Sequence, residues 1–531
     1  MMTTAAPRTM PGLSRTARHR IRVAAITLVV LAAWEVLGRF GLVAGGALPA
    51  PSAILEAWWA DWEEYPRHIL ATVGTAAAGF AIGNGVAIVI AIATQLVPAI
   101  DRLIRPLVVV LFCLPVVVAA PILGIAFDDP WPKIALAVLL VFFPTLIATQ
   151  VGLRGAPGDA VSVVRSAGGG ALRALFLVRL RAAVPEILSG LQISAPAAVL
   201  GAILGEFIGG RWGLGIYLVG SISSGNPAII WAIGLTATAL SAILYGVLGL
   251  VRLWYGSTEK LLTLDLPSTR RVAGSALRKA LERVGWLIAG LAVLIGAWYA
   301  FIASTGLPVT LMNSPTEVFN TLVTSDRAPE LRAELGEAFL SSLSPAVIGS
   351  AAGILFAFVL ATLFATFPSI GASAMPFAFI SQTVPLVALA PLIALAFGRG
   401  PATVVAVTVS VTFFPSLVTI MQGLAGAPSG PLDVLRSVNA GRFAVLSKVV
   451  VPNAVPHLLA SVRLAVPRAL TGVLIAEQLI TGTGLGGLLS QARGYLDYRL
   501  MWAIAVVVAV FSLIVYGLAQ LAEDGVLKRR R

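Results

Sequence analysis

Charged residues, cysteine and histidine are scarce in this chain. Only 11% of its 531 residues are charged, whereas a soluble protein of this size carries about a quarter, so the chain as a whole is not soluble. The single cysteine, Cys113, excludes a disulfide framework and a cysteine-based metal site. Three scattered histidines make no catalytic or metal-binding pattern. We therefore expect no catalytic residues, no metal ion and no enzyme.

A phosphate-binding lysine motif is also missing. The pattern G-x-x-x-x-G-K-[ST], whose backbone amides and lysine hold nucleotide phosphates, occurs nowhere in the sequence. The glycine-rich stretch GTGLGGLL (482–489) has no lysine and follows no predicted strand, so we expect it to be an outward-facing turn. The chain is therefore expected to bind no cofactor and to have no ATPase activity of its own.

Long apolar runs dominate what is present. Hydrophobic residues make up 58% of the chain, and a helix needs about 20 of them in succession to cross a hydrocarbon layer of about 30 Å. A dozen such runs predict an all-α integral membrane protein with about 12 transmembrane helices. The runs lie near residues 22–43, 69–96, 104–126, 133–152, 185–209, 228–251, 284–303, 339–367, 375–397, 402–422, 455–480 and 500–521.

The charges that remain are unevenly placed. Arginine and lysine gather in the N-terminal tail, the loops 153–184 and 252–283 and the C-terminal KRRR, while acidic residues gather in the alternate loops. This positive-inside pattern predicts a multi-pass protein of the bacterial cell membrane with both termini in the cytoplasm. The net charge of +13 therefore indicates membrane orientation and not nucleic-acid binding.

The sequence repeats itself once. VFFPTL (141–146) returns as TFFPSL (412–417), and LPVVVAAPILGIAF (114–127) returns as VPLVALAPLIALAF (384–397), 270 or 271 residues later. Such self-similarity indicates a duplicated domain. Six spans per copy make both copies face the same way, related by an axis along the membrane normal. The repeated prolines predict kinked or broken helices. We expect a first repeat at 1–251, a basic cytoplasmic linker at 252–283 and a second repeat at 284–531.

The segment between the fourth and fifth spans carries a second repeated pattern, in residues 164–192 and 435–463. Each copy has a basic residue and a serine, a turn with glycine or asparagine, an amphipathic basic stretch, and a proline expected to open the next span. We expect two short helices around a tight turn, because glycine and asparagine tolerate positive φ. The segment is either a docking surface or a basic loop held by anionic lipid headgroups.

These segments resemble the EAA motif of ABC-importer permeases, and the whole chain resembles, twice over, the nitrate/sulfonate/taurine-type group of that family. A glutamate followed by GLG after the fifth span is another shared feature. The resemblance implies coupling helices on which two copies of a separate ATP-binding subunit dock, with ATP and Mg²⁺ used by that partner. It gives this coupling role to Arg165, Ser166, Gly168, Gly170, Pro185, Asp433, Arg436, Ser437, Asn439, Gly441, Pro452 and Pro456.

Each copy departs from the family pattern. The first acidic position of the motif holds Ser162 in the first half, and Asn439 stands where the first half has Gly168. Arg181 occupies the position that is Pro452 in the second half. We therefore expect the two ATPase contacts not to be equivalent.

Charged residues inside spans are costly and indicate function. Arg468 lies ~18 Å along the eleventh span from Pro456, close to mid-membrane. We expect it either to attract an anionic substrate or to bond carbonyls or a carboxylate. Arg463, nearer the cytoplasmic edge, is expected to snorkel to the interface. The residues expected to line the path with Arg468 are Gln192, Gln382, Thr383 and Asn84.

Glu206 and Glu477 are the carboxylates at the ends of spans five and eleven, near the outer face. They are expected either to be plain helix-end carboxylates, to pair with Arg211 and Arg493, or to touch an external binding protein.

The resulting prediction is the transmembrane subunit of an ATP-driven importer for a small solute. Its implied partners are the ATP-binding subunits, an extracytoplasmic substrate-binding protein and membrane lipid, and nucleic acid is not among them. An anion such as a sulfonate, taurine, nitrate or carboxylate is the first choice of substrate, and a pyrimidine or vitamin precursor is the second. An ion-driven transporter of six plus six spans would need carboxylates inside the spans, and a membrane enzyme would need a catalytic cluster.

Overall fold

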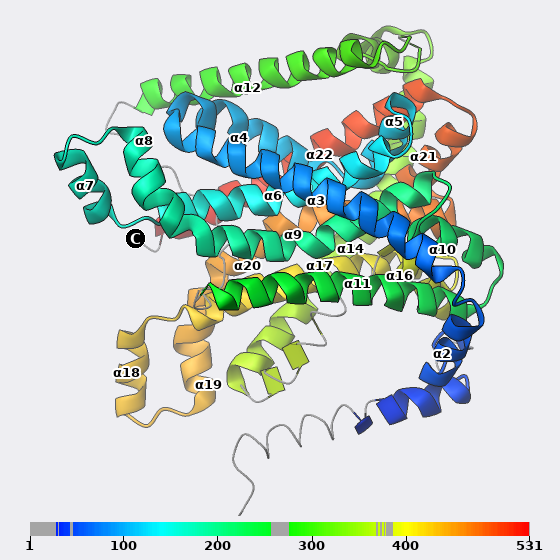
Figure 1. Cartoon of the computed structure of the whole chain (residues 1–531), viewed down its shortest axis with the longest axis horizontal. Helices are drawn as coiled ribbons and strands as arrows, with labels where there is room; N and C mark the ends of the chain where they lie inside the picture. The colour runs from blue at the N-terminus through cyan, green and yellow to red at the C-terminus, as the bar shows by residue number, and fades with distance from the viewer. Residues whose placement is uncertain are drawn as a thin grey trace, which may run out of the picture.

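The computed structural model describes residues 28–29, 31–42, 46–255, 276–308, 310–367, 370–371, 374–375, 378 and 386–529. All elements of these residues are helices, arranged as a bundle whose long axes run roughly side by side (Figure 1). Most of the expected linker 252–283 lies outside the described residues.

The first half forms one set of helices. They are α2 (Pro51–Ala60), α3 (Tyr65–Leu96), α4 (Pro98–Cys113), α5 (Val116–Ala126), α6 (Trp131–Arg154), α7 (Gly158–Ser166), α8 (Ala171–Ala174), α9 (Leu180–Ile208), α10 (Leu214–Ser223) and α11 (Pro227–Trp254). A π-helical turn, Leu175–Arg179, joins α8 to α9.

The second half repeats this order. Its helices are α12 (Ala276–Thr305), α13 (Pro315–Phe319), α14 (Ala328–Thr366), α16 (Leu386–Phe397), α17 (Pro401–Ala425), α18 (Ser429–Ser437), α19 (Arg442–Val445), α20 (Val451–Ala476), α21 (Gly484–Gly494) and α22 (Tyr498–Arg529). The π turns Leu446–Val450 and Glu477–Thr481 lie on either side of α20.

Nine helices among the described residues are long and apolar enough to cross a membrane, and the bent pair α4–α5 is a tenth if it counts as one span. The other two predicted spans, 22–43 and 375–397, lie partly outside the described residues. The span predicted at 104–126 is not one helix, because the chain bends by 99° between α4 and α5. Pro115 has no N–H to donate and keeps Leu114 extended, which ends α4.

Small residues bring three helices of each half into close contact. A side chain on Gly201 of α9 or Gly79 of α3 would overlap Ala137 of α6. In the second half, Gly349 of α14 lies against Thr408 of α17 in the same way. Helices in lipid pack through such small residues because apolar burial from water cannot drive their association.

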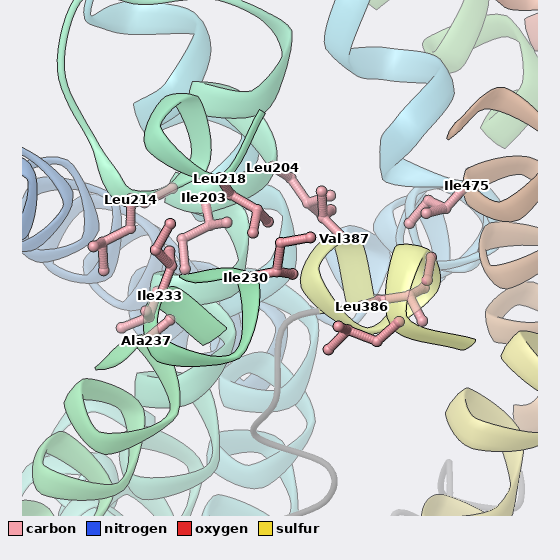
Figure 2. Packing of buried hydrophobic residues seen from close by; sticks show 14 of the residues in the cluster. Ile203, Leu204, Leu214, Leu218, Ile230, Ile233, Ala237, Leu386, Val387 and Ile475 are labelled. Carbon is pink, nitrogen blue, oxygen red and sulfur yellow. The ribbon is translucent and has the colours of Figure 1, made fainter. Parts of the chain in front are cut away.

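The two halves meet through helices that cross between them. Helix α12 packs on α4, α22 packs on α4 and α5, and α16 packs on α10 and α11. A buried apolar cluster includes Leu204 and Ile230 of the first half and Val387 and Ile475 of the second. Figure 2 shows Leu204 beside Val387, and Ile475 of the second half on the far side of Val387 from Ile203 and Leu218 of the first half. Leu204 and Ile475 are equivalent positions of the two copies, so the cluster lies where the repeats face each other.

Candidate functional site

Two helical hairpins project from the same end of the bundle (Figure 1). We call residues 158–179 hairpin one and residues 429–450 hairpin two, and this end of the bundle the hairpin end. Helices α7 and α8 form the first, and α18 and α19 form the second. The C-terminal end of α22 lies at the same end. The duplicated segments therefore form paired surfaces on one side of the molecule.

The turn of each hairpin has the geometry that its sequence predicts. Gly168 has φ +76° and Asn439 has φ +50°. The amide of Gly169 donates to the Val164 carbonyl at 2.8 Å, and the amide of Ala440 donates to the Leu435 carbonyl at 2.9 Å. Both turns close with the same six-residue hydrogen bond, which is typical of a helix ended by a left-handed residue.

The second helix of each hairpin is not a separate element, which corrects the sequence prediction. α8 continues through its π turn into α9, and α19 continues into α20, so the helix that contains each membrane span begins inside its hairpin. Pro185 and Pro456 consequently lie inside helices and do not open them. A proline inside a span is tolerated where neighbouring groups satisfy the freed carbonyl.

Nine of the twelve predicted coupling residues lie on the hairpins. The exposed ones are Arg165, Ser166, Gly168, Gly170, Asp433, Arg436, Ser437, Asn439 and Gly441. Pro185, Pro452 and Pro456, at the start of the following spans, are half-buried. Asp433 and Arg436 form an exposed ion pair at 3.3 Å, a contact of small energetic value.

The opposite end of the bundle contains two matching carboxylate sites. In the first half, the Thr72 hydroxyl and the Gly215 amide each donate to Oε2 of Glu206 at 2.9 Å. In the second half, the Ser342 hydroxyl donates to Oε2 of Glu477 at 2.8 Å and the Gly486 amide does so at 2.9 Å. We call each a carboxylate clamp, because it fixes the loop 213–215 or 484–486 to the preceding span.

Both clamp carboxylates are inaccessible to a partner. Glu206 is 0% exposed and Glu477 is 1% exposed, which corrects the expectation of contact with an external protein. Among the described residues, Oε1 of Glu206 has no hydrogen-bond partner, so the expected pair of Glu206 with Arg211 does not form. A side chain on Gly213 (φ +142°) or Gly484 (φ +65°) would overlap the clamp carboxyl group, which explains the glycine that opens each loop.

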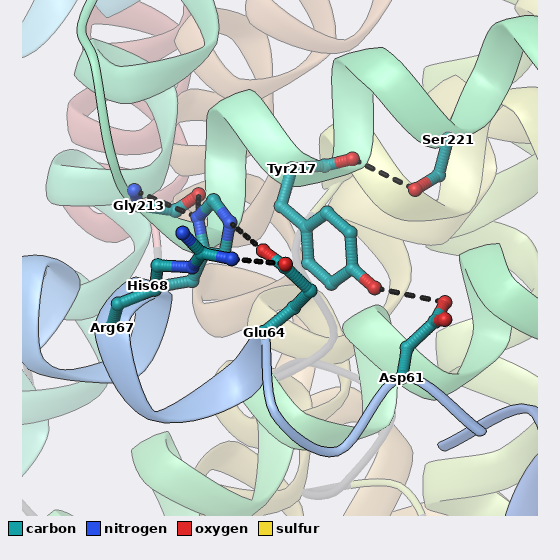
Figure 3. Close-up of polar contacts among 7 residues, drawn as sticks. All are labelled: Asp61, Glu64, Arg67, His68, Gly213, Tyr217 and Ser221. Carbon is teal, nitrogen blue, oxygen red and sulfur yellow. Dashed lines mark hydrogen bonds and ion pairs between the residues drawn. The ribbon is translucent and has the colours of Figure 1, made fainter. Parts of the chain in front are cut away.

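The first half has an additional set of polar contacts beside its clamp (Figure 3). His68 lies 2.9 Å from the Gly213 carbonyl and stacks on Tyr217, with ring centroids 4.6 Å apart. The Tyr217 hydroxyl donates to Asp61 at 3.1 Å. The second half has Ala338 and Leu488 at the positions of His68 and Tyr217. The loop 213–215 of the first half is thus held by more side-chain contacts than the loop 484–486 of the second half.

Thr72 and Ser342 test the clamps as a matched pair. Thr72→Val or Ser342→Ala should lower the free energy of unfolding by about 1–3 kcal/mol, because a buried carboxylate loses a donor. Thr72→Ser and Ser342→Thr keep the hydroxyl and should have little effect. Thermal unfolding in detergent measures the difference. Equal midpoints for Thr72→Val and Thr72→Ser would show that the clamp contributes no stability.

Two residues expected to line the path contact neighbouring helices of their own half. Nε2 of Gln192 lies 3.5 Å from the Tyr245 carbonyl of α11, so this side chain points to a helix of its own half. Asn84 joins three helices, because Thr145 of α6 and Ser194 of α9 both donate to its Oδ1. Gln382 and Thr383 lie outside the described residues.

Arg468 lies on the face of α20 that points towards the other half. It precedes Ile475 by seven residues, which is two turns of a helix and places both side chains on one face about 10 Å apart. Ile475 belongs to the cluster shared by the halves, and α20 also contacts α5 of the first half. Within the described residues, the half-buried Arg468 guanidinium has no hydrogen-bond or ion-pair partner.

Arg463 forms an ion pair inside the bundle, a contact that the expectation of a side chain extending to the interface did not include. Its side chain is buried, its Nη1 lies 3.1 Å from Oε2 of Glu523, and its guanidinium lies 5.6 Å from the centroid of the Tyr516 ring. Glu523 is on α22, so the pair joins two spans of the second half. The first half has Gln192 and Arg252 at the corresponding positions. No signal in the sequence of α20 alone predicts this partner.

Among the described residues, no group of three histidine, cysteine or acidic side chains is arranged to hold a metal ion.

Comparison with known proteins identifies the fold. Residues 83–255 and 349–528 each match the family model of the binding-protein-dependent transport system inner membrane component. The two matches cover the two halves, each including one hairpin and one clamp glutamate. The duplication predicted from the sequence is confirmed.

Each of three relatives matches half of this chain or less. The chain is similar to a riboflavin transport system permease protein of Chloroflexus aurantiacus, at 30% identity over 46% of this chain and 91% of the relative. It is also similar to a formylaminopyrimidine transport permease protein of Halalkalibacterium halodurans, at 28% identity over 36% of this chain and 76% of the relative. A putative aliphatic sulfonates transport permease protein of Bacillus subtilis is 26% identical over 50% of this chain and 95% of the relative.

These matches agree with the helical bundle, its apolar spans and its paired hairpins. They make the chain a multi-pass inner-membrane protein of an ABC transporter system, which includes ATPase and substrate-binding partners, and a transport component rather than an enzyme. The chain belongs to the binding-protein-dependent transport system inner membrane component family, as a fused pair of ABC transporter permease units.

Proposed function

We propose that this chain forms both membrane halves of an ATP-driven importer, with one ATP-binding subunit docked on each hairpin. The observation that supports this best is the pair of equivalent hairpins on one end of the bundle. Two equivalent surfaces on one side suit two copies of one partner. That partner supplies the ATP and Mg²⁺ chemistry, and this chain itself binds no cofactor.

The continuity of hairpin and span gives the proposal a mechanical basis. Residues 171–207 and 442–481 are each one helical segment that starts in a hairpin and ends at a clamp. Leu204 and Ile475 of the shared cluster lie near the far ends of these segments. When the ATPase subunits close on ATP, a displaced hairpin therefore moves the apolar cluster without an intervening flexible joint. This motion would open and close the path between the halves.

The proposed orientation places the hairpin end in the cytoplasm. The basic loop 153–184 contains hairpin one, and the basic C-terminus follows α22 to the same end. Basic loops favour the cytoplasmic side. The loops held by the clamps then face outward, where a substrate-binding protein delivers its ligand, and both termini are cytoplasmic.

The proposed substrate is a small anion that contacts Arg468. An arginine inside a membrane span without a partner retains its full hydrogen-bonding capacity, and its planar guanidinium suits a carboxylate, sulfonate or nitrate group. The sulfonate permease among the relatives agrees with this assignment. The riboflavin and formylaminopyrimidine permeases favour a second candidate, a vitamin-type or pyrimidine solute.

A pull-down from native membranes tests the docking proposal. The tagged chain, extracted in gentle detergent, should bring with it an ATP-binding subunit at about two copies per chain, together with a substrate-binding protein. Mass spectrometry identifies both, and ligand screening on the binding protein separates an anion from a vitamin precursor. Isolation of the chain alone, with uptake unaffected by Arg436→Ala, would refute the proposal.

A further inference from the structure

We infer that the two hairpins are unlike docking surfaces and that an ATP-binding subunit binds hairpin one more tightly than hairpin two. This inference rests on the proposed function, since it concerns the same partner. It follows from the exposed apolar side chains of the hairpins and from the way that each hairpin is anchored.

Hairpin one exposes a continuous apolar patch on its second helix. Leu172 is 59% exposed, Phe176 is 62% exposed and Leu177 is 51% exposed. Leu172 and Phe176 are four residues apart, so they lie on one face of the helix. Large exposed apolar groups that form one patch mark an interaction surface.

Hairpin two has only part of this patch. Phe443 stands at the position of Leu172 and is 76% exposed, but Ser447 and Lys448 replace Phe176 and Leu177. Its other large exposed apolar groups are Val438, at the turn, where hairpin one has Ala167, and Val434, which matches the exposed Val163 of hairpin one. On the second helix, the apolar surface of hairpin two is therefore smaller than that of hairpin one.

Contact with membrane lipid does not explain why the apolar side chains of Phe176 and Leu177 are exposed on the protein. The equivalent Ser447 and Lys448 are also exposed, and a lysine in the hydrocarbon layer would be strongly unfavourable. Arg179, two residues beyond Leu177, is of the type that marks the cytoplasmic edge of a span. This level of the hairpin thus lies outside the hydrocarbon core of the membrane. Exposed apolar side chains at this level are suited to contact with a protein partner.

The hairpins also differ in how firmly they are held. Val161, Ala174 and Leu175 of hairpin one are buried, and α7 packs on both α8 and the π turn. The corresponding helices and π turn of hairpin two contain no buried residue. A surface that is already ordered loses less conformational freedom on binding than one that is not. Both the more ordered structure and the larger exposed apolar area of its second helix therefore favour binding of the ATP-binding subunit to hairpin one.

Reciprocal exchange of two residues tests the inference. The first variant, Phe176→Ser with Leu177→Lys, gives hairpin one the residues of hairpin two. The second, Ser447→Phe with Lys448→Leu, makes the opposite change. The full-length chain in lipid nanodiscs is titrated, without nucleotide, with the ATP-binding subunit that co-purifies with it. Mass photometry counts the subunits bound at each concentration.

We expect the wild-type chain to bind a first subunit at least tenfold more tightly than a second. The first variant should lose the tight step, and the second should bring both steps to similar affinity. The second variant adds binding, so misfolding cannot imitate its result. Two equal steps in the wild type, unchanged by either exchange, would overturn the inference while leaving the proposed function intact. Failure of any ATP-binding subunit to bind would refute the proposed function and the inference together.

Discussion

Arg468→Gln should lower ATP-driven uptake of an anionic substrate about tenfold or more. The substitution removes the charge but retains a polar side chain of similar size at the interface between the halves. A charge-assisted hydrogen bond in a site shielded from water contributes about 1.5–3 kcal/mol, which corresponds to this loss. Initial uptake rates into proteoliposomes measure the effect, at equal amounts of assembled complex.

Arg468→Lys provides the matched control. Lysine keeps the charge but loses the planar pair of donors, so we expect an intermediate rate. ATPase subunit binding should be unchanged in both variants, because Arg468 lies far along α20 from hairpin two. Wild-type uptake by both variants, with the protein folded, would exclude a role in anion binding and favour a neutral pyrimidine- or vitamin-type substrate.

Arg463→Gln should lower the free energy of unfolding by about 1–3 kcal/mol, because it removes the ion pair between the buried Arg463 and the half-buried Glu523. The first half shows that the fold does not require this pair, since Gln192 and Arg252 occupy the equivalent positions. Stability is measured as the midpoint of thermal unfolding in detergent.

The double variant Arg463→Gln with Glu523→Gln separates loss of the pair from loss of one partner. The double variant removes both charges of the pair, so much of the stability should return. A double variant as unstable as Arg463→Gln alone would mean that the loss arises from packing of the Arg463 stem and not from breaking the ion pair.

The sequence predicts the large-scale organisation of this protein well, because repeats and apolar runs are properties of the chain itself. The FFP motifs and the glutamate–GLG pairs establish the duplication without structural knowledge. The left-handed turn residues Gly168 and Asn439 also follow from residue type, since few residues adopt positive φ cheaply.

The sequence cannot predict which buried groups pair across the bundle. Thr72 and Glu206 are distant in the chain, and either alone is compatible with many roles. Aligning the halves would have given a signal, because Thr72 and Ser342 are hydroxyl residues at equivalent positions. The prolines misled for a local reason: Pro185 is suited to a helix start, but the helix had already begun in α8 and continued through its π turn.

ATP-dependent uptake in proteoliposomes tests the central claim most directly. The chain is reconstituted with its co-purifying ATP-binding subunit, with ATP and Mg²⁺ on the hairpin side and ligand-loaded binding protein on the other side. The account predicts substrate accumulation that requires ATP and persists after proton and sodium gradients are collapsed with ionophores. Substrate accumulation that does not require ATP and depends on an imposed ion gradient would contradict the account.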